Sequence, residues 1–165
     1  MDTEDIKNKL RGLLSETRFK HSLNVAKTAV SLAKLHSANA GKAEIAGLLH
    51  DCAKHLKGHG PHGIASAYIA KKKFGIRDKD ILNAIANHTC GRTKMSKLEK
   101  IIYISDHIEP GRKHKKVSAM RSAAKKDLNK AIALIASGMI RYLLEKDVPI
   151  FEQTLTTRNY YLNNG

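Results

Sequence analysis

Hydrophobic residues recur along most of the chain with the three- and four-residue spacing of amphipathic helices. This pattern predicts helices over residues 4–14, 16–36, 43–53, 62–73, 80–87, 96–108 and 127–144. Turn-forming residues, such as Gly58 to Pro61 and Pro110-Gly111, separate several of them. Alternating β-branched runs bounded by turns, which would indicate strands, are missing from the sequence. We therefore predict an all-α fold.

One domain is expected, because no repeat, low-complexity tract or Pro/Ser-rich linker divides the 165 residues. Ser96 and Glu99 have the spacing of a capping box, in which the serine caps a helix and the glutamate reaches back to it. The prediction is a single-domain helical bundle over residues 1–165, with its core within about 6–145. The tail from Arg158 to Gly165 is expected to fray.

Composition and charge narrow the functional classes. Two cysteines cannot build a disulfide framework, which favours a reducing compartment and hence a cytoplasmic protein. No apolar run approaches the ~20 residues of a membrane span, and the acidic residues 1–5 do not resemble a signal peptide. The net charge of +15 predicts attraction to polyanions such as nucleic acids or nucleotides. Nine histidines are many for a chain of this length. Their positions indicate which function the positive net charge has.

His50 and Asp51 stand side by side at the end of the apolar segment from Ile45 to Leu49. Imidazole and carboxylate together suit iron, manganese or zinc better than calcium or magnesium. Lys54 follows on the same helical face as the pair. Its ammonium group would be repelled by a metal ion unless an anion such as phosphate lay between them. Taken alone, the pair is more typical of a helix C-terminal cap with a surface salt bridge.

Further candidate ligands stand at helix ends or on an apolar helix. Asp106 lies within the apolar run from Ile101 to Ile108, and a buried carboxylate needs a partner or a metal. An ion pair with Arg112 or a nearby lysine is the alternative. His21 begins one helical segment and His88 ends another. Their joint occurrence favours a metal site over ordinary polar positions.

The order His21, His50-Asp51, His88-Thr89, Asp106 resembles the HD superfamily of metal-dependent phosphohydrolases, an all-helical family with the pattern H…HD…D. Four segments resemble its YqeK-type bacterial branch more closely: RFKHSLNV (18–25), AGLLHDCAK (46–54), AIANHT (84–89) and YISDHIEPGR (103–112). That branch consists of symmetrical diadenosine tetraphosphate hydrolases with a dinuclear iron centre. The resemblance spans residues 6–145 approximately.

The resemblance implies one more metal-binding histidine, which precedes a helix and is followed by Gly and then by Ala-Tyr. His62-Gly63 and Ala67-Tyr68 match this pattern. It thus implies two metal ions, with iron favoured over manganese or cobalt, held by His21, His50, Asp51, His62, His88 and Asp106. The segment between Asp51 and His62 is shorter than the family usually has, so His59 stays an alternative to His62.

Basic side chains near these ligands are candidates for phosphate binding. Arg112 follows Asp106 across the Pro110-Gly111 turn, and its guanidinium could make a bidentate contact with a phosphate. We expect Asp51, Lys54 and Arg112 to act in catalysis. The substrate is expected to contact Arg18, Lys54, Thr89, Arg112 and Arg121. In this hypothesis a water activated by two metals attacks a phosphoanhydride phosphorus. The resemblance implies that the substrate is diadenosine tetraphosphate and that it yields two ADP.

Other interpretations stay open at this point. The chain could be a different HD nucleotide phosphohydrolase, either a phosphomonoesterase or a cyclic-nucleotide phosphodiesterase. It could instead be a basic RNA- or ribosome-associated binding module, although it has no Trp and only 5% aromatic residues. Most lysines between Arg112 and Lys130 are expected to lie on a solvated face. Whether the chain forms a homodimer stays an open question. Cys52 and Cys90 lack Cys-x-x-Cys spacing, so buried, reduced thiols are expected rather than zinc ligands.

Overall fold

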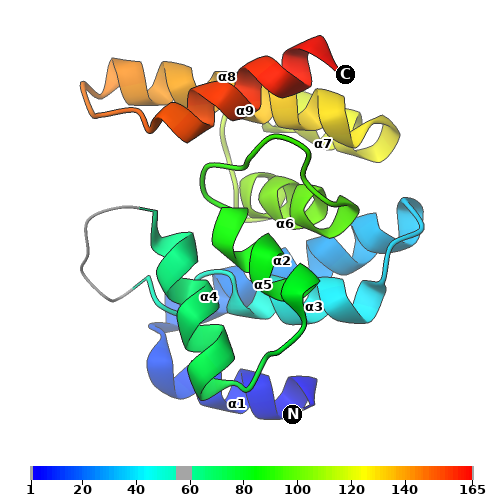
Figure 1. Cartoon of the computed structure of the whole chain (residues 1–165), viewed down its shortest axis with the longest axis vertical. Coiled ribbons are helices and arrows are strands. Elements are labelled where there is room, and N and C mark those ends of the chain that lie inside the picture. The colour runs from blue at the N-terminus through cyan, green and yellow to red at the C-terminus, as the bar shows by residue number, and fades with distance from the viewer. Residues whose placement is uncertain (1, 55–60, 165) are drawn as a thin grey trace.

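The computed structural model describes residues 2–54 and 61–164, and these form nine α-helices and no strand (Figure 1). In chain order the helices are α1 (Thr3–Leu13), α2 (Glu16–Leu35), α3 (Ala40–Leu49), α4 (His62–Lys73), α5 (Lys79–Asn87), α6 (Lys97–Ile108), α7 (Val117–Lys126), α8 (Leu128–Glu145) and α9 (Glu152–Asn163). The prediction of an all-α, single-domain fold is confirmed. Within the described ranges, no helix combines the length and the apolar character needed to cross a membrane.

Seven helices correspond to predicted ones, and local capping sets their ends. The capping box at the start of α6 is confirmed, since Ser96 and Glu99 exchange side-chain and backbone hydrogen bonds. α3 begins at Ala40 instead of residue 43, because the Asn39 side chain accepts a hydrogen bond from the Lys42 N–H at 2.9 Å. It ends at Leu49, so the His-Asp pair follows in a turn rather than inside the helix.

The apolar periodicity does not predict α7. This helix lies in the basic stretch that we expected to be a solvated face, and it does expose its lysines. Its other face buries Val117, Met120 and Ala124, which recur at helical spacing. The intervening residues are serine, alanine and arginine, and the apolar pattern is short because only one narrow side of the helix packs against the bundle.

The apolar periodicity also misses α9, and the expectation of a frayed tail is wrong for the residues up to Asn163. α9 buries Thr154, Thr157 and Tyr161 against the bundle, and two of these three are polar. Tyr161 is almost fully buried, and its hydroxyl accepts a hydrogen bond from the Met95 N–H at 2.8 Å. These contacts anchor the C-terminal helix, although it has little apolar amphipathicity.

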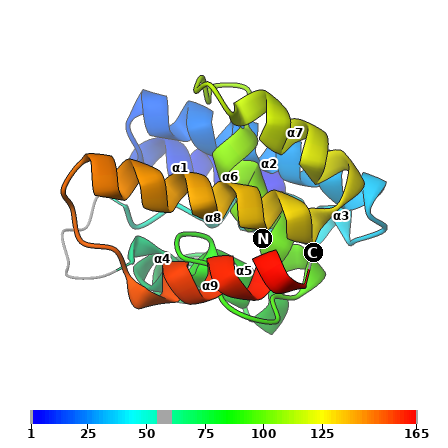
Figure 2. The ribbon, with the colours of Figure 1, turned by 90° about the horizontal axis from the view of Figure 1, so that it is seen from above.

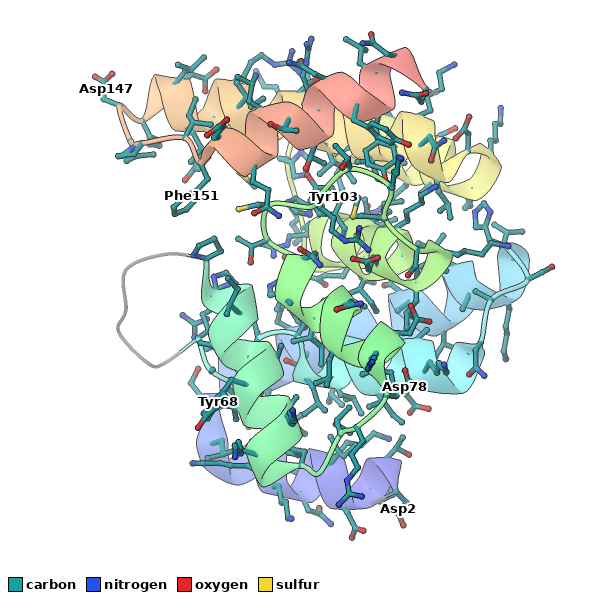
Figure 3. The ribbon with its side chains drawn as sticks, viewed as in Figure 1. Asp2, Tyr68, Asp78, Tyr103, Asp147 and Phe151 are labelled. Atoms are coloured by element: carbon teal, nitrogen blue, oxygen red, sulfur yellow. The ribbon has the colours of Figure 1, made fainter. Side chains whose placement is uncertain are left out.

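α6 forms the centre of the bundle. Ile101, Ile102, Tyr103 and Ile104 are all buried, so the helix is apolar on successive faces. It packs against α2, α5 and α8, and it lies between the α7–α8–α9 layer and the remaining helices (Figure 1). Tyr103 lies between α6 and this layer (Figure 3). α8 and α9 run side by side as an antiparallel pair within it (Figure 2).

Two glycines let neighbouring helices approach closely near the candidate ligands. A Cβ atom on Gly47 of α3 would lie 2.7 Å from Cα of Ala26 in α2. A Cβ atom on Gly63 of α4 would lie 2.9 Å from the carbonyl oxygen of Ile85 in α5. Side-chain carbons do not pack this closely against backbone atoms, so glycine is required at both positions. The contacts bring the end of α3 and the start of α4 close to α2 and α5.

Candidate metal centre

Five helices bring histidine and aspartate side chains to one place in the bundle. They come from α2, from the turn after α3, from the first residue of α4, from the C-terminal cap of α5 and from α6. These side chains are the six predicted ligands: His21, His50, Asp51, His62, His88 and Asp106. Four are buried, whereas His21 and His62 are partly exposed. The interpretation of His50 and Asp51 as a surface salt bridge is wrong, because they are 0% and 1% exposed.

His21, His50 and Asp106 form one cluster. Nε2 of His21 lies 3.0 Å from Oδ1 of Asp106, and Nε2 of His50 lies 3.8 Å from the same oxygen. The two Nε2 atoms are 3.3 Å apart. Nitrogen and oxygen ligand atoms at these separations lie close enough for one metal ion to contact all three.

Asp51 joins this cluster to a second one that contains His62 and His88. Its Oδ1 lies 2.9 Å from Nε2 of His62 and 3.4 Å from Nε2 of His88. Its Oδ2 lies 3.7 Å from Nε2 of His50, on the side of the first cluster. The Nε2 atoms of His62 and His88 are 3.0 Å apart. The two Asp51 oxygens therefore face different clusters, as a carboxylate that bridges two metals would.

The hydrogen bonds around the clusters leave unprotonated nitrogens facing inwards. Nδ1 of His50 donates to the Gly47 carbonyl at 2.8 Å, and Nδ1 of His88 donates to the Ile85 carbonyl at 2.7 Å. In a neutral ring the proton then sits on Nδ1, which leaves an electron pair on Nε2. Oδ1 of Asp51 is fully buried and accepts no hydrogen bond of good geometry despite its short distance to His62. Such a set of inward-facing electron pairs fits metal cations.

The pKa shifts of His50, Asp51 and Asp106 agree with this chemistry. Burial lowers the pKa of His50 to about 4, although the Asp51 charge opposes this, so the imidazole is neutral near pH 7. Burial raises the pKa of Asp51, but contacts with histidines, His62 first, outweigh it and hold the pKa below its usual range. Asp106 shows the same balance, and its pKa lies well below the usual range. Neutral imidazole and ionised carboxylate are the forms that bind metals.

Three basic side chains contact the carboxylates of the site. Nζ of Lys54 lies 2.8 Å from Oδ2 of Asp51, and Nη1 of Arg18 lies 4.0 Å from the same oxygen. Nη2 of Arg112 donates to Oδ1 of Asp106 at 2.6 Å, so the ion pair considered for Asp106 is also present. Cations this close to a metal centre are suited to an anionic ligand that extends beyond the metals.

The structure places the remaining predicted residues in different surroundings. Thr89 belongs to the site, since its Oγ1 lies 3.5 Å from Nε2 of His62 and 3.4 Å from Nε2 of His88. Arg121 does not face the clusters. Its guanidinium donates to the backbone carbonyls of residues 108, 109 and 112 at distances of 2.9 to 3.2 Å. It therefore supports the turn after α6. His59, the alternative to His62, lies outside the described residues.

Sequence analysis does not single out Glu109, although it belongs to the centre. Its Oε1 lies 3.2 Å from Nδ1 of His21, its Oε2 accepts a hydrogen bond from Asn24 at 3.0 Å, and the residue is 4% exposed. Burial lowers the pKa of His21, but hydrogen bonds to Asp106 and Glu109 outweigh it and raise the pKa. The available signal was an acidic residue directly after a buried apolar helix and before Pro110.

Two cavities adjoin the clusters, and Lys54 and Arg112 line both of them. The α2 cavity has a volume of about 480 Å³, and its other lining residues include Arg18, Lys20, His21 and Asn24. The α8 cavity has a volume of about 600 Å³ and extends from His62, Thr89 and Asp106 to the residues of α7 and α8. The candidate metal centre thus lies where two cavities meet.

Cys52 and Cys90 are buried, free thiols. Sγ of Cys52 donates to the carbonyl of Ser66 at 3.3 Å, and neither thiol belongs to a possible metal-binding group among the described residues. The expectation that both thiols are buried is confirmed.

Comparison with known proteins places the chain in a family. The HD domain model matches residues 18–111. The symmetrical bis(5'-nucleosyl)-tetraphosphatase of Halalkalibacterium halodurans is 39% identical, over 90% of this chain and 91% of that protein. The protein of the same name from Bacillus subtilis is 35% identical over the full length of both. A crystal structure of a predicted HD superfamily hydrolase involved in NAD metabolism, from Clostridium acetobutylicum, matches with a TM-score of 0.95 and 41% identity, covering 100% of this chain and 99% of that one. The protein therefore belongs to the HD domain family and, within it, to the family of the symmetrical bis(5'-nucleosyl)-tetraphosphatases.

Proposed function

We propose that this protein hydrolyses dinucleoside tetraphosphates symmetrically, converting diadenosine tetraphosphate and water into two ADP. The observation that carries the proposal is the convergence of five histidine and aspartate ligands, with His62 beside Asp51 and His88, next to Lys54 and Arg112 where two cavities adjoin. Full-length relatives that bear the name of this activity support it. Lys54 and Arg112 would lie near the centre of a bound tetraphosphate, with one half of the substrate in each cavity.

The six ligands would hold two metal ions, with Asp51 facing both. Bound there, the ions would act as Lewis acids that activate water and neutralise phosphate charge. Iron is our first choice, and manganese or cobalt would suit the same nitrogen and oxygen ligands. We place the activity in the cytoplasm, since Cys52 and Cys90 are free thiols.

The basic side chains would bind and orient the phosphates. Lys54 and Arg112 line both cavities, so they are positioned to contact the two central phosphates. Arg112 would exchange a hydrogen bond to Asp106 for one to a phosphate oxygen, and its guanidinium can hold two such oxygens at once. Arg18 lines only the α2 cavity and would contact an outer phosphate there.

The bond changes follow from this placement. The oxygen of water forms a bond to one of the two central phosphorus atoms, and the bond from that phosphorus to the central bridging oxygen breaks. The leaving ADP keeps the bridging oxygen, whose negative charge Lys54 and Arg112 would stabilise. Two protons of the water are released as the two ADP products reach their ionised forms. A cut at this bond, unlike a cut at an outer bond, gives identical halves.

The Asp51→Asn variant tests the role of the ligands. Replacing a carboxylate that faces both clusters should remove most bound metal and reduce the formation of ADP by at least about 100-fold. Asp147→Asn is the matched control, because Asp147 is exposed in the turn between α8 and α9 (Figure 3). Metal content is measured by elemental analysis, and ADP by anion-exchange chromatography. Full activity and metal content in Asp51→Asn would contradict the proposal.

A further inference from the structure

The α8 cavity changes character along its length. Its inner end contains Lys54, Thr89 and Arg112, which belong to the candidate metal centre. The other part of the cavity is lined by side chains of α7 and α8, of which Met120 and Ile135 are buried, Met139 is partly exposed and Tyr142 is exposed. Lysines 115 and 116 and Arg141 also line it, so the apolar end has a basic margin. A ligand in this cavity would meet cations at one end and an apolar surface at the other.

The α2 cavity lacks this apolar end. The described residues that line it are polar, charged or glycine, and they include Thr17, Lys20, Asn24 and Gly111. The two sides of the metal centre therefore differ in chemistry, although the two halves of a symmetrical dinucleoside tetraphosphate are identical. Of the two cavities, the α8 cavity is the one whose described lining includes a tyrosine ring and two thioethers, and base faces pack on aromatic rings and on polarisable thioethers.

Gly138 keeps the apolar end open. It lines the α8 cavity, and a Cβ atom at this position would lie 3.1 Å from Cε of Met120 on the facing helix α7. Any side chain here would enter the cavity or displace the Met120 methyl group. Tyr142 follows four residues later on α8, one turn away on the same side, and is 54% exposed, so its ring is available for stacking.

We propose that the α8 cavity is a nucleoside subsite that binds the base of one half of the substrate on Met120, Met139 and Tyr142. The proposal rests on the hydrolytic function proposed above. The base in this subsite provides most of the nucleoside recognition, whereas the other half of the substrate is held in the α2 cavity through its phosphates. Recognition is therefore asymmetric, although the cut is symmetric.

A substrate with one nucleoside should then suffice. Adenosine 5'-tetraphosphate carries a single adenosine and the same four phosphates. With its base in the α8 cavity, water would cleave the same central bond and give ADP and pyrophosphate. We expect its KM to lie within about threefold of the KM for diadenosine tetraphosphate. A KM at least tenfold higher would show that both nucleosides are recognised and would overturn the asymmetry.

Two variants test the subsite directly. Gly138→Leu fills the apolar end, and Tyr142→Ala removes an exposed ring whose loss does not open the core. Each should raise the KM for diadenosine tetraphosphate about tenfold, with kcat within about twofold of the unsubstituted protein, because stacking contributes mainly to binding. Tyr142→Phe should retain the original KM, since it keeps the ring. Gly12→Leu is the matched control, because Gly12 is on α1 and a Cβ atom there meets no neighbour within 4 Å.

Inhibition by products separates this proposal from the proposed function. In the unsubstituted protein ADP should inhibit at least tenfold more strongly than pyrophosphate, and both variants should lose most of this difference. If the unsubstituted protein makes no ADP from diadenosine tetraphosphate, the proposed function fails. If it makes ADP, but Gly138→Leu and Tyr142→Ala keep its KM and its preference for ADP, the subsite is wrong while the function stands.

Discussion

Nε2 of His21 lies 3.3 Å from Nε2 of His50, and Oδ1 of Asp106 lies within 4 Å of both atoms. The Nε2 of His50 has an electron pair to offer, since its Nδ1 donates to the Gly47 carbonyl. A metal cation bound between these atoms would accept their electron pairs. The packing of α2, α3 and α6 holds them at this separation, so the fold and the metal site depend on each other.

Removal of the metals should therefore destabilise the protein. A chelator such as EDTA is expected to lower Tm by on the order of 10 °C and to abolish hydrolysis, because metals bind the folded state and not the unfolded one. Adding back manganese or ferrous iron should restore both. Differential scanning calorimetry and elemental analysis follow the change. An unchanged Tm after complete loss of metal would contradict this dependence.

Glu109 should tune metal affinity through His21. Its carboxylate holds Nδ1 of the ring, so Glu109→Ala is expected to weaken metal binding about 10- to 100-fold. Glu109→Gln keeps an acceptor of the same shape and should retain most of the affinity. Titration of the metal-free protein with manganese measures both values. The exposed Glu152→Ala serves as control, and equal losses in Glu109→Gln and Glu109→Ala would count against a hydrogen bond to His21 as the cause.

Arg121 should matter for stability more than for substrate affinity. Its three hydrogen bonds to backbone carbonyls support the turn that carries Glu109 and Arg112. Arg121→Ala is expected to lower the free energy of unfolding by about 2 kcal/mol, with KM changed less than about twofold. Urea unfolding and steady-state kinetics give the two quantities, with the exposed Lys125→Ala as control. A raised KM at unchanged stability would instead support direct substrate binding.

Gly63 should be required for the position of His62. A Cβ atom there would approach the Ile85 carbonyl to 2.9 Å, so Gly63→Ala must push α4 away from α5. We expect a loss of about 2 kcal/mol in the free energy of unfolding and weaker binding of the second metal, because His62 moves away from His88. Gly12→Ala is the control. Unchanged stability and metal stoichiometry in Gly63→Ala would show that the helices tolerate the methyl group.

The two thiols should be unreactive in the folded protein. Burial raises the pKa of Cys52 to about 12 and also raises the pKa of Cys90. Since both pKa values lie above the usual range, the thiolate fraction at pH 8 is small, and the thiolate is the reactive form. Ellman's reagent at pH 8 is expected to react with neither thiol within minutes and with both after unfolding in guanidinium. Rapid reaction of the native protein would contradict the burial.

Sequence alone was sufficient for the parts of the molecule in which apolar residues repeat with helical spacing. α2 and α6 follow this pattern, and the ligands stand at its ends, so His21 and Asp106 could be recognised together with the His50-Asp51 pair. α9 could not be predicted in this way, because Thr154 and Thr157 are buried but polar. Its anchoring depends on the Tyr161 hydroxyl and the Met95 N–H, which are distant in sequence.

The same limit applies to the side chains around the ligands. Arg121 and Arg112 both lie in a basic stretch, and spacing could not show that one guanidinium is used by the backbone while the other contacts Asp106. Glu109 was missed because its partners, His21 and Asn24, lie 88 and 85 residues away. The apolar end of the α8 cavity could not be found either, since it forms only where α7 and α8 pack together.

We propose that the histidine and aspartate cluster supports hydrolysis at the middle of a dinucleoside tetraphosphate. The most direct test is the hydrolysis of diadenosine tetraphosphate in ¹⁸O-water by the metal-loaded protein, with mass spectrometry of the products. We expect ADP as the only nucleotide product, with one ¹⁸O atom in half of the ADP molecules. Formation of ATP and AMP, or of no product at all, would contradict it.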